Sequence, residues 1–576
     1  MASMQRKRSQ RGITMYLGVL GLVMIVPMVG LVIDVGILYS AKSRLQAAVD
    51  GASLAAARAL NLGQTTDAQK STAKQNAVNW FYANFPSGNW STMNTQMDTS
   101  DAHVLVQDDP NNSNLRDVNV TASTTVPTWF MRWFNLNSTT IYAQGFASRR
   151  DVVAMMVLDR SGSMCKGGSN PCTGASSTPC GSMVTAAKNF TGQFAENRDY
   201  IGLVSFSDNT YIHSAPTQTF QSTLGYTNDS GSASGDIDNI SCGGGTSTAE
   251  AISMAYQLLY ETNLPGALNV ILLETDGLPN TLAMNFYDST NSVAGLTNTS
   301  GCKDNNNKTK SGGGFNNAAS IPHWTPGLLL NASPFGTTHP YFGNIPAGMV
   351  GTVSSEDPGG GGHFWNMINY WTTYGQSESA GNSTYPFNSV TSSSSPSILT
   401  TTNSPASNGC NFLSSGYYTT NPNDIAWWPS TDIMGNHLNP SAYSYLSVTT
   451  DAQGHVTQSG SSPGNWSNYH NAVMNATNDS AYQARTNGTL PATIFAIGLG
   501  GNSASGPPDP VLLQRMANDP NADEFNNPST YVSCASATNC ATFSSQPQGT
   551  FIYSPTATNL GAAFLRISSQ ILRLSH

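Results

Sequence analysis

Charged side chains are scarce in this sequence, because Asp, Glu, Lys and Arg together make up only 10% of its 576 residues. The formal net charge is −9, and no stretch beyond the N-terminus is basic enough to neutralise a row of phosphates. This scarcity argues against a nucleic-acid partner. The length is too great for one compact domain and is typical of roughly two to four domains.

The sequence also lacks common signatures of catalysis. It has neither a HExxH zinc-protease motif nor a Walker A phosphate loop, and its nine histidines are scattered. We therefore expect a protein that is not an enzyme. Absent motifs do not exclude chemistry, so an enzyme within the long insertion described below is a less favoured alternative.

Close cysteine pairs are absent as well, although the chain has eight cysteines. None forms a CxxC pair of the kind that zinc knuckles use, which argues against a structural zinc site. Most lie in stretches rich in Gly, Ser and Asn, and loop cysteines pair readily in an oxidising compartment. We predict disulfides, and Cys534 and Cys540 are close enough in sequence to close a small loop.

An apolar segment near the N-terminus is the first positive feature. Residues 1–12 carry four basic side chains and no acid, and residues 13–33 follow without any charge. As a helix, this run spans a hydrocarbon core of about 30 Å. Because basic flanks stay in the cytoplasm, we predict a cytoplasmic tail (1–12), a single transmembrane helix (13–33), and a periplasmic or extracellular bulk. A cleaved signal peptide is the alternative, but its apolar region would be shorter.

The helix is expected to continue beyond the membrane over residues 34–62, where apolar side chains recur at helical spacing. Three motifs mark this region: Arg11-Gly12, Asp34-Val35-Gly36 and the run from Leu45 to Ala52, LQAAVDGA. Together they resemble the N-terminal region of the TadG-like proteins of Flp/Tad pilus assembly. The resemblance implies a pilin-like helix extension and partners among pilus-assembly components.

Residues 63–149 are predicted to form a β-rich linker module. From Val104 onward, short runs alternate β-branched and polar residues between clusters of Asn, Asp and Pro. The segment PTWFMRWF (127–134) is apolar in a polar setting. Two interpretations remain open for it: packing against the module's own sheet, or contact with the membrane or a partner.

Apolar runs of strand length then alternate with helical patterns. The runs cover 151–158, 200–206 and 267–274, and this alternation predicts an α/β domain with a doubly wound parallel sheet over residues 150–576. Further elements are expected at 469–487, 491–501, 509–519 and 556–574. Residues 281–465, between the run 267–274 and the element expected at 469–487, show no periodicity. We interpret them as a long insertion that either shapes partner binding or is a surface excursion.

Polar oxygen-bearing residues follow these strands. Asp159, Ser161 and Ser163 come after the first, Thr246 ends a Gly-rich loop before a helix, and Asp276 follows the third. Since carboxyl ends of parallel strands meet at one sheet edge, their side chains should converge. Carboxylate and hydroxyl oxygens suit Mg²⁺, with Mn²⁺ or Ca²⁺ as alternatives. The competing interpretation is that they are turn residues or helix caps.

The spaced motifs DxSGS, GGT and TDG resemble the metal-ion-dependent adhesion site (MIDAS) of von Willebrand factor A (VWA) domains. The resemblance implies a Rossmann-like VWA fold, metal ligation by the five residues just named, and an open position that accepts an acidic residue from a protein partner. We therefore expect a membrane-anchored protein that binds a partner in pilus assembly or surface adhesion. The alternative is a structural scaffold of the pilus system that does not use the metal site.

Overall fold

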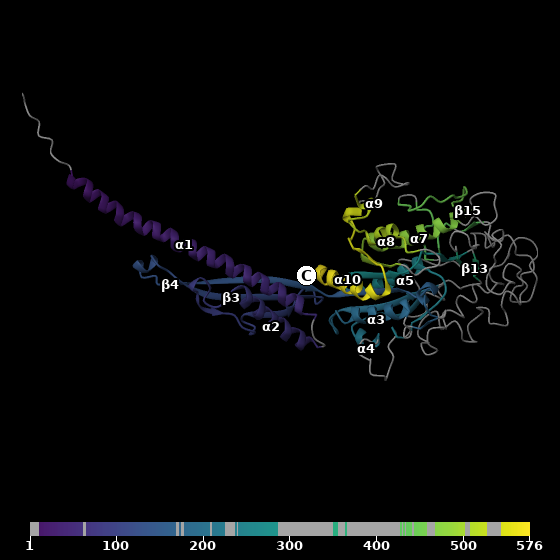
Figure 1. The fold of residues 1–576 in the computed structure, drawn as a ribbon, viewed down its shortest axis with the longest axis horizontal. Helices are drawn as coiled ribbons and strands as arrows, with labels where there is room; N and C mark the ends of the chain where they lie inside the picture. The colour runs from purple at the N-terminus through teal and green to yellow at the C-terminus, as the bar shows by residue number, and fades with distance from the viewer. Residues whose placement is uncertain are drawn as a thin grey trace, which may run out of the picture. The chain divides into compact units, whose positions relative to one another are not determined.

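The protein is described from a computed structural model, which divides it into two compact units (Figure 1). Unit 1 comprises Met1–Asp151 with Leu572–His576, and unit 2 comprises Val152–Ile571. The residues described are 11–61, 65–168, 172–173, 178–207, 210–224, 237–238, 240–285, 350–354, 363–365, 427–428, 430–432, 434–440, 443–457, 467–500, 507–526 and 543–575. The expectations for residues 1–10, for most of the insertion and for Cys534–Cys540 lie outside these ranges.

Unit 1 is built around one long helix. Helix α1 (Arg11–Ala59) runs without a break through the predicted span and the predicted extension. By length and composition it could cross a membrane, and side chains of its first half, such as Leu22 and Met24, are exposed. Its second half buries Leu45, Val49 and other apolar residues against the rest of unit 1.

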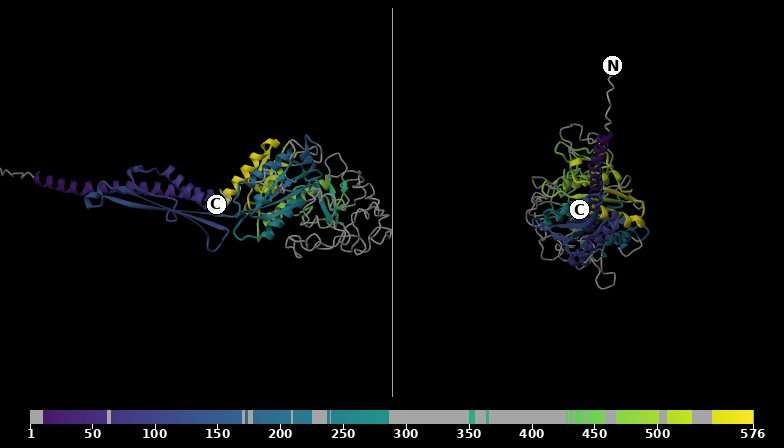
Figure 2. Two further views of the ribbon diagram at one scale, coloured as in Figure 1. Left: turned by 90° about the horizontal axis from the view of Figure 1, so that it is seen from below. Right: turned by 90° about the vertical axis from the view of Figure 1, so that its left-hand side faces the viewer.

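The remainder of unit 1 is an antiparallel sheet with a second helix. Strands β3 (Leu115–Pro127) and β4 (Ser138–Arg150) pair along their whole length, and Figure 2 shows them lying along α1. Strands β1 (Met93–Gln96) and β2 (Val104–Asp108) pair with β3. Along β3 every second residue is buried, as expected for a strand with one face on a core.

Helix α2 (Thr66–Asn84) was not predicted. Its buried residues are Gln69, Ala73, Ala77 and Phe81, which recur at every fourth position on one face. Two alanines and a glutamine give only a weak apolar stripe, so the sequence of this stretch shows little of the apolar periodicity that predicts a helix. The module is therefore a sheet covered by two helices.

Unit 2 has the expected α/β architecture. Its six-stranded sheet has the order β17-β16-β10-β5-β7-β8, in which only β8 is antiparallel to its neighbour. The strands span Val152–Asp159 (β5), Tyr200–Phe206 (β7), Thr210–Thr217 (β8), Leu268–Thr275 (β10), Thr493–Leu499 (β16) and Phe551–Ser554 (β17). Residues of β5 and β10 are buried throughout, which explains why they form largely apolar runs in the sequence, interrupted in β10 by Asn269.

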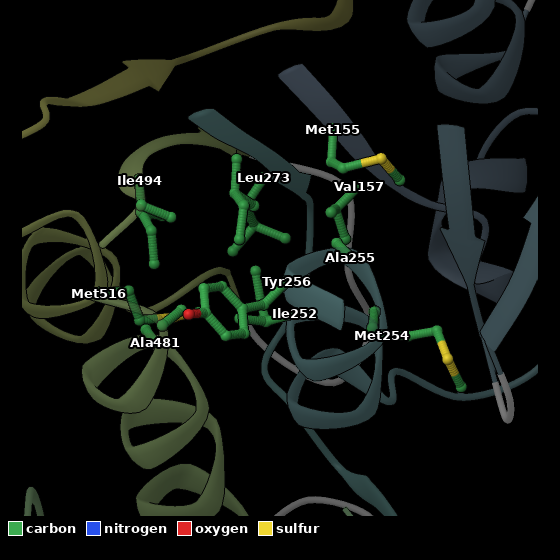
Figure 3. Close-up of a cluster of buried hydrophobic side chains, with 14 of the residues drawn as sticks. Met155, Val157, Ile252, Met254, Ala255, Tyr256, Leu273, Ala481, Ile494 and Met516 are labelled. Atoms are coloured by element: carbon green, nitrogen blue, oxygen red, sulfur yellow. The ribbon is translucent and has the colours of Figure 1, made fainter. Parts of the chain in front are cut away.

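Helices cover the sheet of unit 2. On one face, α5 (Thr248–Thr262), α7 (Ser467–Thr486) and α8 (Pro510–Ala517) share a core with alternate strand residues. Figure 3 shows part of this core, in which Tyr256 of α5 lies among strand residues such as Leu273. Helices α3 (Pro179–Thr191) and α10 (Leu560–Leu574) meet through Phe190 and Phe564, whose ring centroids are 6.0 Å apart.

Short elements complete the unit: helices α4 (Phe220–Thr223) and α9 (Asp523–Asn526), and strands β6 (Cys172–Thr173), β9 (Ser241–Cys242), β11 (Thr281–Asn285), β12 (Val350–Ser354), β13 (His363–Trp365), β14 (Trp427–Trp428) and β15 (Val456–Thr457). Part of the predicted insertion, comprising the described residues 430–432, 434–440 and 443–457, packs on the domain itself. There Met434 joins the core, and the Asn436 amide donates to the Ser253 hydroxyl at 2.9 Å.

The start of β5 is held by a buried carboxylate. Asp199 accepts hydrogen bonds from the backbone N–H of Val152 at 2.9 Å and of Ala195 at 2.7 Å. Replacing Asp199 with Ala leaves two buried donors unpaired, and we expect the free energy of unfolding to fall by about 3 kcal/mol. Chemical denaturation of the full chain measures this loss. Asp199→Asn keeps one acceptor oxygen, so a cost equal to that of the alanine variant would contradict the explanation.

Candidate metal centre

The candidate site lies where two neighbouring parallel strands end. Strands β5 and β10 pair from Leu268↔Val152 to Glu274↔Leu158, so that Asp159 and Thr275 reach the same edge of the sheet. After β5 the chain crosses to β7 on one side, whereas β10 lies on the other. This is the point at which the strand order reverses, and ligands of open α/β sheets bind at such points.

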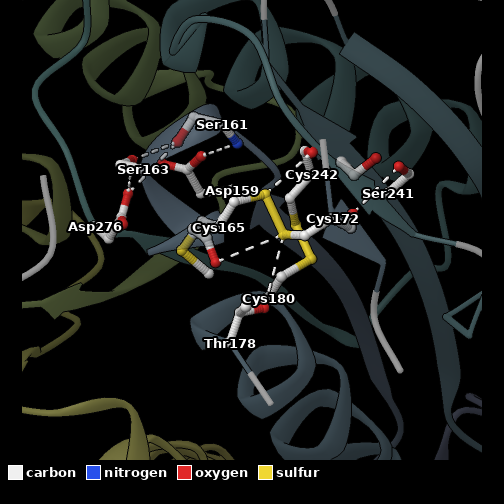
Figure 4. The surroundings of a disulfide bond; sticks show 12 residues. Asp159, Ser161, Ser163, Cys165, Cys172, Thr178, Cys180, Ser241, Cys242 and Asp276 are labelled. Atoms are coloured by element: carbon white, nitrogen blue, oxygen red, sulfur yellow. Dashed lines mark hydrogen bonds between the residues drawn. A yellow bond between two sulfur atoms is a disulfide. The ribbon is translucent and has the colours of Figure 1, made fainter. Parts of the chain in front are cut away.

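The residues predicted after β5 and β10 converge there, as Figure 4 shows. The Ser161 N–H donates to Asp159 Oδ1 at 2.8 Å, and the Ser161 and Ser163 hydroxyl oxygens are 2.9 Å apart. Both hydroxyls donate to Asp276 Oδ1, that of Ser161 at 3.5 Å. Four of the five predicted side chains therefore form one cluster of oxygen atoms.

Thr246 reaches this edge through its loop. The loop and the one after β5 are joined by two backbone hydrogen bonds, from Gly162 N to Gly244 O at 2.9 Å and from Gly243 N to Arg160 O at 2.6 Å. Thr246 itself is nearly buried, and its N–H donates to Asn280 Oδ1 at 2.8 Å. Among the described residues, no hydrogen bond joins the Thr246 hydroxyl to the other four predicted side chains.

Three buried carboxyl groups gather at this edge. Burial raises the pKa of Asp159, while hydrogen bonds from Ser161 and Thr275 oppose the rise. Burial and the neighbouring charge of Asp159 raise the pKa of Asp276 to about 8. Burial, together with both aspartates, raises the pKa of Glu274 well above its usual value. A cation would relieve this accumulation of negative charge.

The donor set fits a hard divalent ion. Asp276 Oδ2 is buried and has no hydrogen-bond partner among the described residues, which normally costs free energy. It stands beside two hydroxyl oxygens and a second carboxylate, the ligand types that Mg²⁺ takes. An orphaned carboxylate oxygen in such a cluster is what a metal ligand presents without its ion.

Sequence analysis missed two residues of this site, Thr275 and Asn280, and it interpreted Glu274 as a strand-end residue rather than a ligand. The Thr275 hydroxyl donates to Asp159 Oδ2 at 2.6 Å and so fixes the carboxylate's orientation. Asn280 holds the Thr246 loop, and Glu274 adds a third carboxyl group. Thr275 stands directly before Asp276, a position that could have been considered, whereas the role of Asn280 depends on a contact 34 residues away in sequence.

Two disulfides lie next to the site, and they confirm the disulfide prediction for four cysteines. Cys165 pairs with Cys172, and Cys180 with Cys242. Three of these sulfur atoms lie within 4.8 Å of one another, yet all four cysteines are engaged in disulfides (Figure 4). Cys165 is two residues from Ser163, and Cys242 directly precedes the loop that carries Thr246. The bridges therefore anchor both loops.

Comparison with protein families matches two segments of the chain. Residues 154–278 match the family described as von Willebrand factor type A domain, and residues 12–59 match the family described as Flp pilus-assembly TadE/G-like. No curated protein sequence matches significantly.

Among solved structures, the vWF domain of the type V pili tip protein Mfa5 from Porphyromonas gingivalis is 16% identical, with a TM-score of 0.30, covering 75% of this chain and 98% of that one. The PilB minor pilin from Streptococcus sanguinis is 10% identical, with a TM-score of 0.29 and coverages of 82% and 79%. The match to three N-terminal domains of Mfa5, at 22% identity and a TM-score of 0.19, covers 32% of this chain and only 26% of that structure.

Both family matches fall on the segments whose motifs carried the two resemblances. Residues 154–278 contain all five predicted site residues, and residues 12–59 lie within α1. The chain therefore combines a von Willebrand factor type A domain with an N-terminal TadE/G-like segment of the pilus-assembly kind.

Proposed function

We propose that this protein is anchored in the cell membrane by α1 and binds a protein partner through a divalent ion held at the edge of its VWA domain. Mg²⁺ is the first choice of ion. Asp159, Ser161, Ser163, Thr246 and Asp276 would hold it, directly or through water. The buried, unpartnered Asp276 Oδ2 amid hydroxyl and carboxylate oxygens is the observation that carries this proposal.

The role of the ion is to present positive charge to a partner. With one oxygen from each, two aspartates and three hydroxyls supply five ligands for a divalent ion that takes about six. An acidic side chain from a partner would complete the shell. The family match at the N-terminus supports a partner among pilus-assembly components or, for an adhesin, on an outside surface. The function is thus binding rather than catalysis.

Titration calorimetry of the full-length chain in detergent micelles tests the metal site. We expect Mg²⁺ to bind at one ion per chain, and Asp159→Asn to weaken binding by at least about tenfold, since it removes a charged ligand. The matched control is Asp101→Asn, which alters an exposed aspartate of unit 1 paired with Lys74. Equal Mg²⁺ affinity in the wild type and Asp159→Asn would contradict the proposal.

The Asn280 side chain gives a second, independent prediction. Its Oδ1 accepts from the Thr246 N–H and from the Thr281 hydroxyl at 2.7 Å, so it positions the Thr246 loop and is not among the proposed ligands. Asn280→Ala should lower Mg²⁺ affinity by about tenfold, as loss of a supporting contact does at metal sites. Asn280→Asp keeps the acceptor oxygen and should bind more tightly than the alanine variant. The same calorimetric titration distinguishes these outcomes.

A further inference from the structure

The turn between β3 and β4, residues 128–137, exposes large apolar side chains. The exposed fractions are 59% for Trp129, 68% for Trp133, 59% for Phe134 and 54% for Leu136. They sit in and around a short 3₁₀ helix, Met131–Phe134, none of whose residues is buried. Clustered exposure of this kind marks a surface that contacts something apolar. We refer to residues 128–137 as the aromatic turn.

The aromatic turn is fastened to α1 at the end of its apolar run. The Asp34 carboxylate accepts three backbone hydrogen bonds, from Trp129 N at 3.0 Å, Phe130 N at 2.8 Å and Met131 N at 2.7 Å. Asp34 is the first charged residue after the run 13–33. The aromatic turn is therefore attached to α1 at the level where the apolar run ends.

A second contact lies within the apolar run itself. A Cβ at Gly30 would clash with the Phe130 ring, so the ring lies directly on this glycine. Gly30 is one helical turn before Asp34 and belongs to the predicted span. Hence the aromatic turn reaches back beside the part of α1 that would already lie in the bilayer.

The composition of the turn fits the boundary between lipid and water. Tryptophan is enriched at both membrane interfaces, where its ring meets the acyl chains and its N–H meets water. Arg132 is exposed, and its guanidinium lies 5.8 Å from the centre of the Trp129 ring. A cation beside an aromatic ring at this level can pair with lipid phosphate while its stem stays among apolar atoms.

Asp34 is suited to hold the turn at such a boundary. Although burial acts to raise its pKa, the three backbone N–H groups and the nearby Arg132 lower the pKa below its usual value. The carboxyl group thus stays ionised and keeps its role as a triple acceptor. It also satisfies donors at the start of the 3₁₀ helix, which would be costly to leave unpaired near lipid.

We propose that the aromatic turn is a second membrane contact, which inserts into the headgroup and upper acyl region of the bilayer where α1 leaves it. This inference rests on the proposal that residues 13–33 span the membrane. The turn would then hold the sheet of unit 1 at the membrane surface and limit the tilt of α1. The occupant is the lipid bilayer and not a second protein chain.

Quenching of tryptophan fluorescence by brominated lipids tests the proposal. The full-length chain is reconstituted into phosphatidylcholine vesicles carrying bromine either near the headgroup or near the end of the acyl chain. Two of the ten tryptophans lie in the turn, so shallow bromine should remove up to about one fifth of the emission. The double variant Trp129→Phe/Trp133→Phe should lose this quenching while keeping the turn apolar. The matched control is Trp80→Phe, an exposed tryptophan of α2.

The outcomes separate the inference from the anchor on which it rests. Shallow quenching that persists in Trp80→Phe but vanishes in the double variant supports the aromatic turn as a lipid contact. Protein that resists alkaline carbonate extraction, yet shows equal quenching in the wild type and the double variant, overturns the inference alone. In that case, turn emission that depends on protein density in the vesicle points to a second copy. Protein removed by carbonate overturns the membrane anchor and the inference together.

Discussion

Replacing Cys180 and Cys242 together with alanine should lower the free energy of unfolding by about 4 kcal/mol, because this disulfide closes a loop of 62 residues. The Cys165–Cys172 disulfide closes a loop of only 7 residues, and its removal should cost about 2.5 kcal/mol. A cross-link stabilises the fold mainly by limiting the unfolded chain, and longer loops lose more freedom. Chemical denaturation of the full chain under oxidising conditions measures both costs.

The two double variants act as controls for each other, because all four cysteines are buried in one cluster. A larger cost for the shorter loop would contradict the loop-length explanation and point to packing instead. Both variants should also weaken Mg²⁺ binding. Cys165 follows the loop that carries Ser161 and Ser163, its sulfur lies 3.3 Å from the Cys242 carbonyl oxygen, and Cys242 precedes the loop that carries Thr246.

The strands that position the candidate metal site were predictable because burial on both faces leaves a simple trace in the sequence. All eight residues of β5 and of β10 are buried, so each appears as an apolar run ended by a polar residue. The expected run 200–206 coincides with β7. Since four of the five candidate ligands, all but Thr246, come at or directly after the ends of such runs, their convergence at one sheet edge could be predicted from the sequence alone.

The remaining parts depend on contacts that leave no local pattern. Residues 430–457 look like irregular chain, yet Asn475 of α7 accepts from the backbone N–H of Tyr445 and Leu446 and donates to the Leu438 carbonyl oxygen. Such polar networks join segments about 30 residues apart and carry no periodicity. Similarly, the three N–H groups that bind Asp34 lie 95 to 97 residues away in sequence.

The second large effect concerns the dependence of stability on pH in the absence of metal. The pKa of Asp276 rises from 3.8 to about 8 on folding, because of burial and the neighbouring Asp159. The folded state therefore binds the proton more tightly than the unfolded state. This contribution to stability is complete below about pH 4 and is lost progressively as the pH rises toward about 8. We expect the metal-free chain to unfold more easily at pH 8 than at pH 5.

Asp276→Asn isolates this contribution, because an amide cannot titrate. Glu261 and Asp432, each with a pKa raised by burial to about 7, change stability in the same direction, but they are present in both proteins. In the presence of a chelator, the midpoint temperature of unfolding should thus fall more steeply between pH 5 and pH 8 for the wild type than for the variant. Saturating Mg²⁺ should flatten only the wild-type curve, since the ion replaces the proton on the carboxylate. Parallel curves for the two proteins, with and without Mg²⁺, would show that Asp276 neither holds the proton nor binds the ion.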